Sequence, residues 1–170
     1  MNVALVPVYV DYYESTVPGL LKSKEALIQK VRSAMSKEHK VILFDKVTDL
    51  DGALSARKRL RRDKPDCVVV LPLVATFSVL TDEIVKGWNK SLVLFSLMKG
   101  SEISKPMTMA KVVAESQSFG AQAAANGWMR AGFKFHVIHQ IAGRTQGMQP
   151  YAVCFGLSRV VCSCVVYKSV

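Results

Sequence analysis

The sequence has no long uninterrupted apolar run and little of the composition typical of disordered or fibrous chains. In its 170 residues, no stretch of about 18 uncharged apolar residues occurs, so no membrane-spanning helix is predicted. The first apolar run, residues 3–10, contains Pro7 and leads directly into Asp11, unlike a signal peptide. With 50% hydrophobic residues, ten Gly and six Pro, disorder and collagen-like repetition are excluded. We therefore expect one compact domain, located in the cytosol and without a membrane partner.

Cysteine and histidine are too few and too unfavourably placed for a disulfide framework or a zinc finger. Of four cysteines, Cys67 stands alone in an apolar run, and Cys154, Cys162 and Cys164 crowd residues 154–170. The chain has only three histidines, and no second cysteine pair lies at zinc-finger spacing from the pair Cys162 and Cys164. Buried, reduced thiols are the expectation, and no metal ligand is assigned in this chain.

Apolar runs alternate along the chain with segments of helical periodicity. Strands are predicted at residues 3–10, 41–44, 67–73, 91–97 and 133–139, and helices at about 20–35, 48–60, 78–88 and 117–131. The strand runs are apolar almost throughout, as in parallel strands covered on both faces. Alternation with short connections predicts a doubly wound α/β domain, flavodoxin-like or Rossmann-like, with a mostly parallel five-stranded sheet in three layers.

The predicted domain covers residues 1–143. Inside it, a loop rich in Gly, Ser and Pro is expected at 99–106, and the small residues between Gly120 and Gly127 predict unusually close helix packing. Residues 144–170 do not continue the alternation. This apolar, cysteine-containing tail is expected to be an edge strand, a segment covered by a partner, or poorly ordered.

Candidate binding residues lie in the loops that follow the strands, because ligands of such sheets bind at the carboxyl ends of the strands. Neither a Gly-x-Gly-x-x-Gly nor a P-loop motif is present, which removes the usual support for nucleotide binding. The loops are residues 11–13, 75–78 and 115–117. Two readings stay open for them. Thr76, Ser78 and Ser116 either contact a ligand or cap helices, and Tyr12 and Phe77 either face a ligand or cover the sheet as core residues.

No catalytic constellation is apparent. The carboxylates near predicted strand ends are Asp11, Glu14 and Glu115, too few and too scattered to assign an acid–base pair. His136 and His139, near the end of the fifth predicted strand, are three residues apart and so face opposite sides of it, which excludes a shared metal.

A dense basic run occupies residues 57–64 of the second predicted helix, and the chain carries a net charge of +10. Nucleic-acid binding is a possible reading of such a run. However, a helix spreads these residues around its surface, and no aromatic residues are interleaved with them. We expect a solvated helix face and no nucleic-acid partner.

Several segments, taken in order, resemble the first domain of the L-fucose and L-arabinose isomerase superfamily of sugar ketol-isomerases. Residues 3–13 resemble the opening strand and substrate-facing loop of that family, and 67–78 resemble its apolar strand with a Thr-Phe-Ser turn. Residues 91–97 resemble its next strand, 115–120 its turn containing Asn and Gln, and 135–143 its following strand with a His near the end. Phe119 stands roughly where the family has a His.

The resemblance implies an enzyme that interconverts an aldose and a ketose through an enediol, with manganese polarising the sugar oxygens. In the family, the carboxylates and the His that bind the metal come from later domains, so this chain implies no catalytic residue and no cofactor of its own. By position, Tyr12, Thr76, Phe77 and Gln117 would contact a monosaccharide, and a homo-oligomer would complete the pocket.

After Gly143 the sequence departs from the family, which suggests a truncated chain that is inactive by itself. The alternative is a stand-alone flavodoxin-like module that binds a sugar or a small anion.

Overall fold

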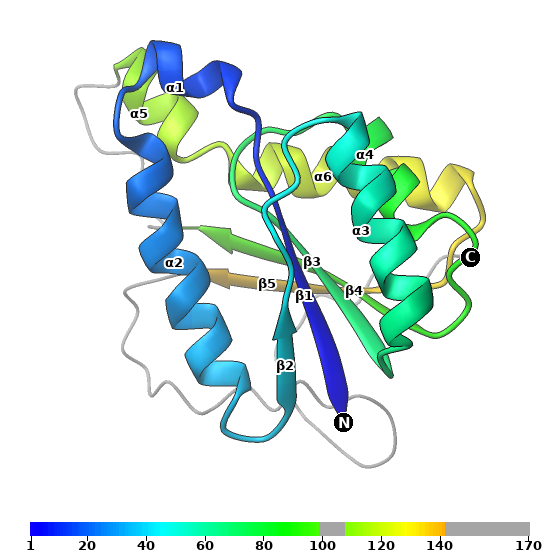
Figure 1. Ribbon diagram of the computed structural model, residues 1–170. Coiled ribbons are helices and arrows are strands. Elements are labelled where there is room, and N and C mark those ends of the chain that lie inside the picture. Colours follow the sequence, from blue (N-terminus) through cyan, green and yellow to red (C-terminus); the bar gives the residue numbers. More distant parts are fainter. Residues whose placement is uncertain (99–107, 142–170) are drawn as a thin grey trace.

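The computed structural model describes residues 1–98 and 108–141 of the chain (Figure 1). In chain order, its elements are β1 (Asn2–Val8), α1 (Tyr12–Thr16), α2 (Leu20–Met35), β2 (Lys40–Leu43), α3 (Leu50–Asp63), β3 (Cys67–Pro72), α4 (Ser78–Val85), β4 (Ser91–Met98), α5 (Met109–Ala114), α6 (Gln117–Arg130) and β5 (His136–Ile141).

The strands form one parallel sheet in the order β2-β1-β3-β4-β5. β1 pairs with β2 on one side and with β3 on the other, where Val8 lies opposite Pro72. Pro72 is the last residue of β3, where a missing N–H does least harm to the ladder. The predicted doubly wound, flavodoxin-like or Rossmann-like α/β architecture is therefore confirmed, and every described strand pair is parallel.

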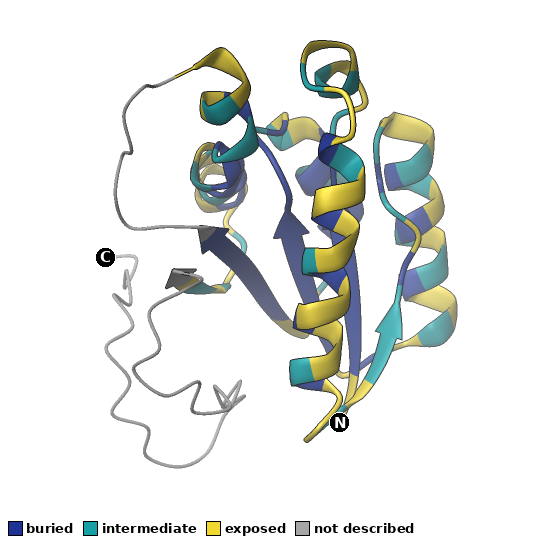
Figure 2. Ribbon diagram, turned by 90° about the vertical axis from the view of Figure 1, so that its left-hand side faces the viewer, coloured by how far each residue is buried: buried dark blue, intermediate teal, exposed yellow. Residues whose placement is uncertain are grey.

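Helices cover both faces of the sheet, which explains why the central strands β1 and β3 are apolar almost throughout. Alternate residues of β1 point to opposite faces: Ala4 and Val6 pack with α3, α4 and α6, whereas Val3 and Leu5 pack with α2 and α5. Figure 2 shows the buried strands between helices whose outer surfaces are exposed. Because both faces of such a strand are covered, apolar residues are favoured at every position and the period-two alternation disappears.

Element boundaries differ from the sequence predictions in several places. α4 ends at Val85 rather than at Trp88, and the fifth strand begins at His136 rather than at Phe133. His136 therefore opens β5 instead of lying near its end. The short helices α1 and α5 were not predicted, because five or six residues are too few to show a periodic pattern.

The predicted loop at 99–106 and the tail at 144–170 lie outside the described residues, as do Cys154, Cys162 and Cys164. Cys67 is a buried free thiol, as expected. Each helix within residues 1–98 and 108–141 is too short or too polar to cross a bilayer.

Candidate functional site

The candidate site lies at the carboxyl ends of β1 and β3. Here the order in which strands are added to the sheet changes direction. β1 connects through α2 to β2 on one side, and β3 connects through α4 to β4 on the other. In doubly wound sheets, this switch point leaves a crevice where ligands bind. The segments at this edge include the turns after β1 and β3 and the junction between α5 and α6 (Figure 1).

Thr76 and Phe77 lead into α4 and have opposite environments. Thr76 is 7% exposed, and its Oγ1 is buried without a hydrogen-bond partner among the described residues. Phe77 occupies the N-cap position of α4, and its side chain is 67% exposed. Phe77 is therefore not a core residue covering the sheet, and a buried hydroxyl lies directly beside an exposed aromatic ring.

The capping role considered for the two serines is wrong. Ser78 follows the N-cap and begins α4, which has no side-chain cap. Ser116 is at the N-cap position of α6 but does not cap it. Its hydroxyl oxygen instead accepts a hydrogen bond from the Ala75 N–H at 2.8 Å and donates one to the Val113 carbonyl at 2.8 Å. The hydroxyl thus joins the α5–α6 junction to the turn after β3.

This link places Gln117 beside the Thr76 turn. Gln117 is 2% exposed, and its Oε1 is a second buried acceptor without a partner in the described part of the chain. One helical turn later, Gly120 packs so closely that a Cβ there would lie 3.0 Å from the Thr76 nitrogen and closer still to the Val74 carbonyl. The close packing predicted for the small-residue helix is confirmed. Thr76, Phe77 and Gln117 therefore form one cluster, which we call the strand-end cluster.

Tyr12 is separate from this cluster. Its side chain is 74% exposed, which excludes a core role, and its ring meets that of Tyr13 edge-on with centroids 6.0 Å apart. It begins α1, which leads into α2 on the opposite face of the sheet from α4 and α6. The structure places Tyr12 at the same edge as the other three residues but attaches it to a different helical layer.

Glu14, considered as an acid–base candidate, holds the start of α2. Its carboxylate accepts hydrogen bonds from the N–H groups of Gly19 at 2.6 Å and Leu21 at 3.0 Å. These bonds, Leu21 first, hold the pKa of Glu14 below its ordinary value. The Tyr9 hydroxyl also donates to this carboxylate, at 3.2 Å, and burial together with this bond raises the pKa of Tyr9 to about 12. These contacts give Glu14 and Tyr9 a structural role at the start of α2.

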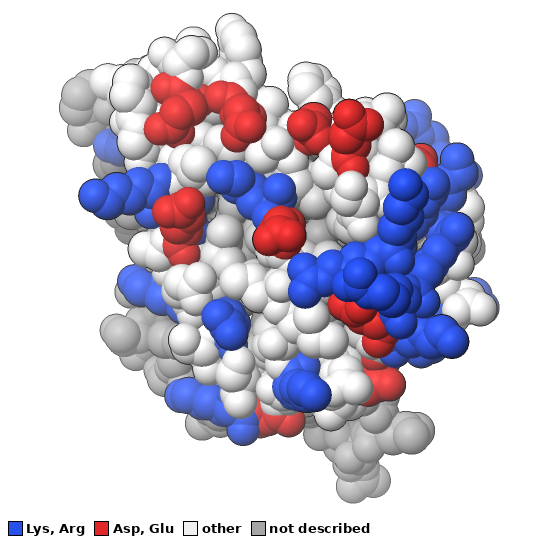
Figure 3. Space-filling model, viewed as in Figure 1, with Lys and Arg blue, Asp and Glu red and all other residues white. Residues whose placement is uncertain are grey.

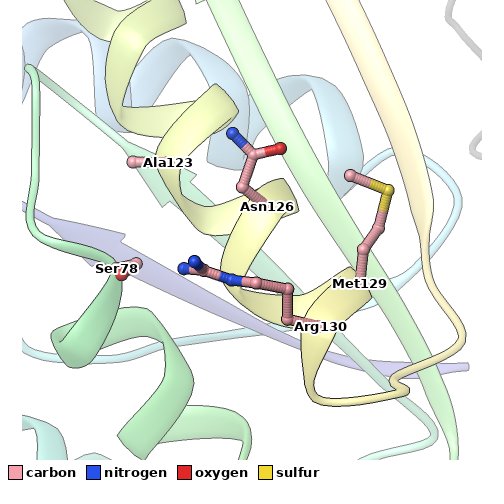
Figure 4. A pocket seen from close by; sticks show the side chains of 5 residues that line it. All are labelled: Ser78, Ala123, Asn126, Met129 and Arg130. Atoms are coloured by element: carbon pink, nitrogen blue, oxygen red, sulfur yellow. The ribbon is translucent and has the colours of Figure 1, made fainter.

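A groove between α4 and α6 was missed in the sequence reading. It has a volume of about 470 Å³ and is lined by Ser78, Ala123, Asn126, Met129 and Arg130 (Figure 4). Beside it, the Asp82 carboxylate packs against Gly127, where a Cβ would lie 2.6 Å from Oδ1. Burial raises the pKa of Asp82, and the nearby Arg130 opposes that rise. Residues from two helices form this groove, and their spacing within each helix gives no sign of it.

Lys and Arg side chains gather over α3 (Figure 3). Several are engaged within the chain: Arg57 pairs with Glu83, and Arg59 bonds Asp63 at 3.2 Å while its guanidinium lies 4.3 Å from the centroid of the Phe44 ring. Such contacts within the chain are consistent with the solvated helix face that the sequence predicts. The absence of a nucleic-acid partner stays a prediction.

Histidine and acidic residues do not gather into a metal site in the described ranges, 1–98 and 108–141: no group of three or more His, Cys, Asp or Glu is placed to hold an ion. The His139 ring nitrogen Nδ1 lies 3.1 Å from the Ser96 hydroxyl, so this histidine bonds the neighbouring strand. Within these ranges the residues offer no ligand set for the manganese that the isomerase resemblance implies, and that resemblance assigns the metal ligands to later domains.

Compared with known proteins, the chain matches no protein-family model and no curated sequence.

Proposed function

We propose that this chain is the sugar-binding first domain of an aldose–ketose isomerase of the L-fucose and L-arabinose type, and that it does not catalyse the reaction alone. The observation that carries the proposal is the strand-end cluster. Two buried oxygens, Thr76 Oγ1 and Gln117 Oε1, lack a described partner at the switch point of the sheet. Leaving a buried polar group unpaired costs about 1–3 kcal/mol, which a binding role would explain.

The chemistry of the cluster suits a monosaccharide. A threonine hydroxyl both donates and accepts, and a glutamine carbonyl oxygen accepts, so together they can bond to adjacent sugar hydroxyls, which also donate and accept. The exposed ring of Phe77 offers an apolar surface beside them. Both oxygens are shielded from solvent here, so binding requires side-chain rotamer changes at this edge, as is common when ligands bind.

The proposal includes a homo-oligomer that covers the carboxyl edge. Large apolar side chains are exposed around it, among them Tyr12 (74%), Phe77 (67%) and Phe119 (59%). Aromatic residues are enriched where proteins associate. Sedimentation of the purified chain tests this part, and a monomer at all concentrations would remove it.

Substitutions that keep the side-chain shape test the sugar site. Thr76→Val and Gln117→Leu remove the unpaired oxygens, so they should abolish binding of L-fucose, L-arabinose and their ketoses, measured by calorimetry and by the ligand-induced rise in Tm. The same variants should be at least as stable as the parent chain, because an apolar side chain of similar shape relieves the unpaired polar group.

Thr81→Val is the matched control. Thr81 is fully buried, and its hydroxyl donates to the Ser78 carbonyl at 2.8 Å. This variant should lose about 0.5–1.5 kcal/mol of stability and keep sugar binding. Failure of the parent chain to bind any of the four sugars, or binding that is unchanged in Thr76→Val, would contradict the proposal. Manganese-dependent turnover by the chain alone would contradict the claim that it is not catalytic by itself.

A further inference from the structure

The α4–α6 groove places one cation near a hydroxyl. Figure 4 shows the Arg130 side chain reaching from α6 toward the start of α4, where Ser78 lies, with Asn126 about one turn earlier on α6. The guanidinium, the serine hydroxyl and the asparagine amide are all donors. The groove is open to solvent, and its volume of about 470 Å³ leaves room for a small molecule.

The start of α4 adds positive potential to this groove. Its N-cap residue is Phe77, no side chain caps the helix, and its first turn has no acidic residue. The first N–H groups of a helix carry partial positive charge, which acidic or capping side chains usually compensate. Arg130, which lines the groove together with Ser78, adds to that potential.

We propose that the α4–α6 groove binds the phosphate group of a small phosphate monoester, held by the Arg130 guanidinium and by a hydrogen bond from Ser78. A phosphate fits better than a carboxylate because it presents three strong acceptor oxygens, which can accept from a guanidinium on one helix and a hydroxyl on the other at the same time. The site is distinct from the strand-end cluster and does not depend on sugar binding there.

Asp82 is the carboxylate that opposes this role. It lies on α4 one turn after Ser78, packs against Gly127, and interacts electrostatically with Arg130. A phosphate bound at Arg130 would be repelled by the Asp82 charge. Removal of that charge should therefore strengthen binding, which distinguishes a phosphate site from a purely structural role of Arg130.

The experiment is calorimetric titration with inorganic phosphate, with ribose 5-phosphate and with unphosphorylated ribose. Arg130→Gln should weaken binding of both phosphates about tenfold or more, because it removes a charged bidentate donor. Ser78→Ala should weaken it less. Asp82→Asn should strengthen it by about threefold, the size of one screened charge–charge interaction. Ribose should not bind through this groove.

Arg61→Gln is the matched control, since Arg61 is an exposed arginine on α3, away from the groove. If Arg61→Gln weakens phosphate binding as much as Arg130→Gln does, binding follows net charge, and the proposal is wrong. It is also wrong if Asp82→Asn leaves phosphate affinity unchanged or lowers it. Thr76→Val should keep phosphate binding while it loses sugar binding, so sugar binding that fails in the parent chain or persists in Thr76→Val would count against the strand-end proposal and not against this one.

Discussion

Replacement of Gly120 by alanine tests how tightly α6 is held against the candidate site. Gly120 lies in the interior of α6, where alanine is favoured over glycine by about 1 kcal/mol in helix propensity. Helix propensity alone therefore predicts that Gly120→Ala stabilises the protein.

The tertiary structure predicts the opposite sign. A Cβ at Gly120 would lie 3.0 Å from the Thr76 nitrogen and 3.1 Å from the Pro72 Cβ, and closer still to the Val74 carbonyl oxygen. The nearest two of these atoms are backbone atoms of the turn after β3, which pairing of β3 with β1 and β4 holds in place. Overpacking of a filled site costs about 1–3 kcal/mol, so after the gain of about 1 kcal/mol in propensity we expect a net destabilisation of up to about 2 kcal/mol.

Gly127→Ala on the same helix is the comparison. Its Cβ would meet the Asp82 carboxylate, with Oδ1 at 2.6 Å. A side-chain carboxylate can rotate away, whereas a strand-end carbonyl cannot. Gly127→Ala should therefore cost less than Gly120→Ala, and the Asp82→Ala background should remove most of its cost.

Urea denaturation followed by tryptophan fluorescence measures both variants. Trp128 is fully buried on α6 and meets Phe135 edge-on with ring centroids 5.2 Å apart, so its emission reports the packing of that helix. A Gly120→Ala variant with a higher midpoint than the parent chain, at unchanged slope m, would refute the close approach of α6 to β3.

Two further predictions concern titrating groups. Because the pKa of Glu14 is lowered, its bonds to Gly19 and Leu21 stabilise the fold above the ordinary pKa of 4.5 and lose that effect as the pH falls through the folded pKa. The difference in urea midpoint between the parent chain and Glu14→Gln should therefore be present at pH 7 and shrink below pH 4.5. A difference that does not change with pH would argue against an ionised Glu14 at the start of α2. Burial raises the pKa of the Cys67 thiol to about 12. Iodoacetamide at pH 8 should therefore leave Cys67 unmodified in the native chain and alkylate it in urea, as measured by peptide mass spectrometry. Rapid modification without urea would mean that β3 is not buried as described.

Local sequence patterns carried most of the fold. The apolar runs at β1 and β3 and the amphipathic spacing of α2 extend over enough residues to be recognised. The helix predicted at about 48–60 begins with Asp49 as N-cap, whose side chain accepts a hydrogen bond from the Gly52 N–H at 2.7 Å. Short elements escaped this reasoning. α5 begins with Thr108, whose hydroxyl accepts from the Lys111 N–H, but one cap in a six-residue helix is a weak pattern.

For the candidate site, the sequence predicted which turns form it but not the environment of each side chain. The strand-end turns were found because parallel strands bring their carboxyl ends to one edge, which placed Thr76, Phe77 and Gln117 among the candidates. Whether each side chain was buried or exposed was not predictable. The Ser116 hydroxyl could have capped its own helix, and only the position of the turn after β3 directs it to Ala75.

The sequence by itself determined the architecture, because burial of both sheet faces requires continuous apolar strands and amphipathic helices, and those patterns are local. The tertiary structure alone decided the chemistry of the surfaces. Unpaired oxygens at Thr76 and Gln117, and a cation facing Ser78 across the α4–α6 groove, arise from contacts between segments about 40 or more residues apart. No local pattern encodes such contacts, because they depend on how closely two helices pack.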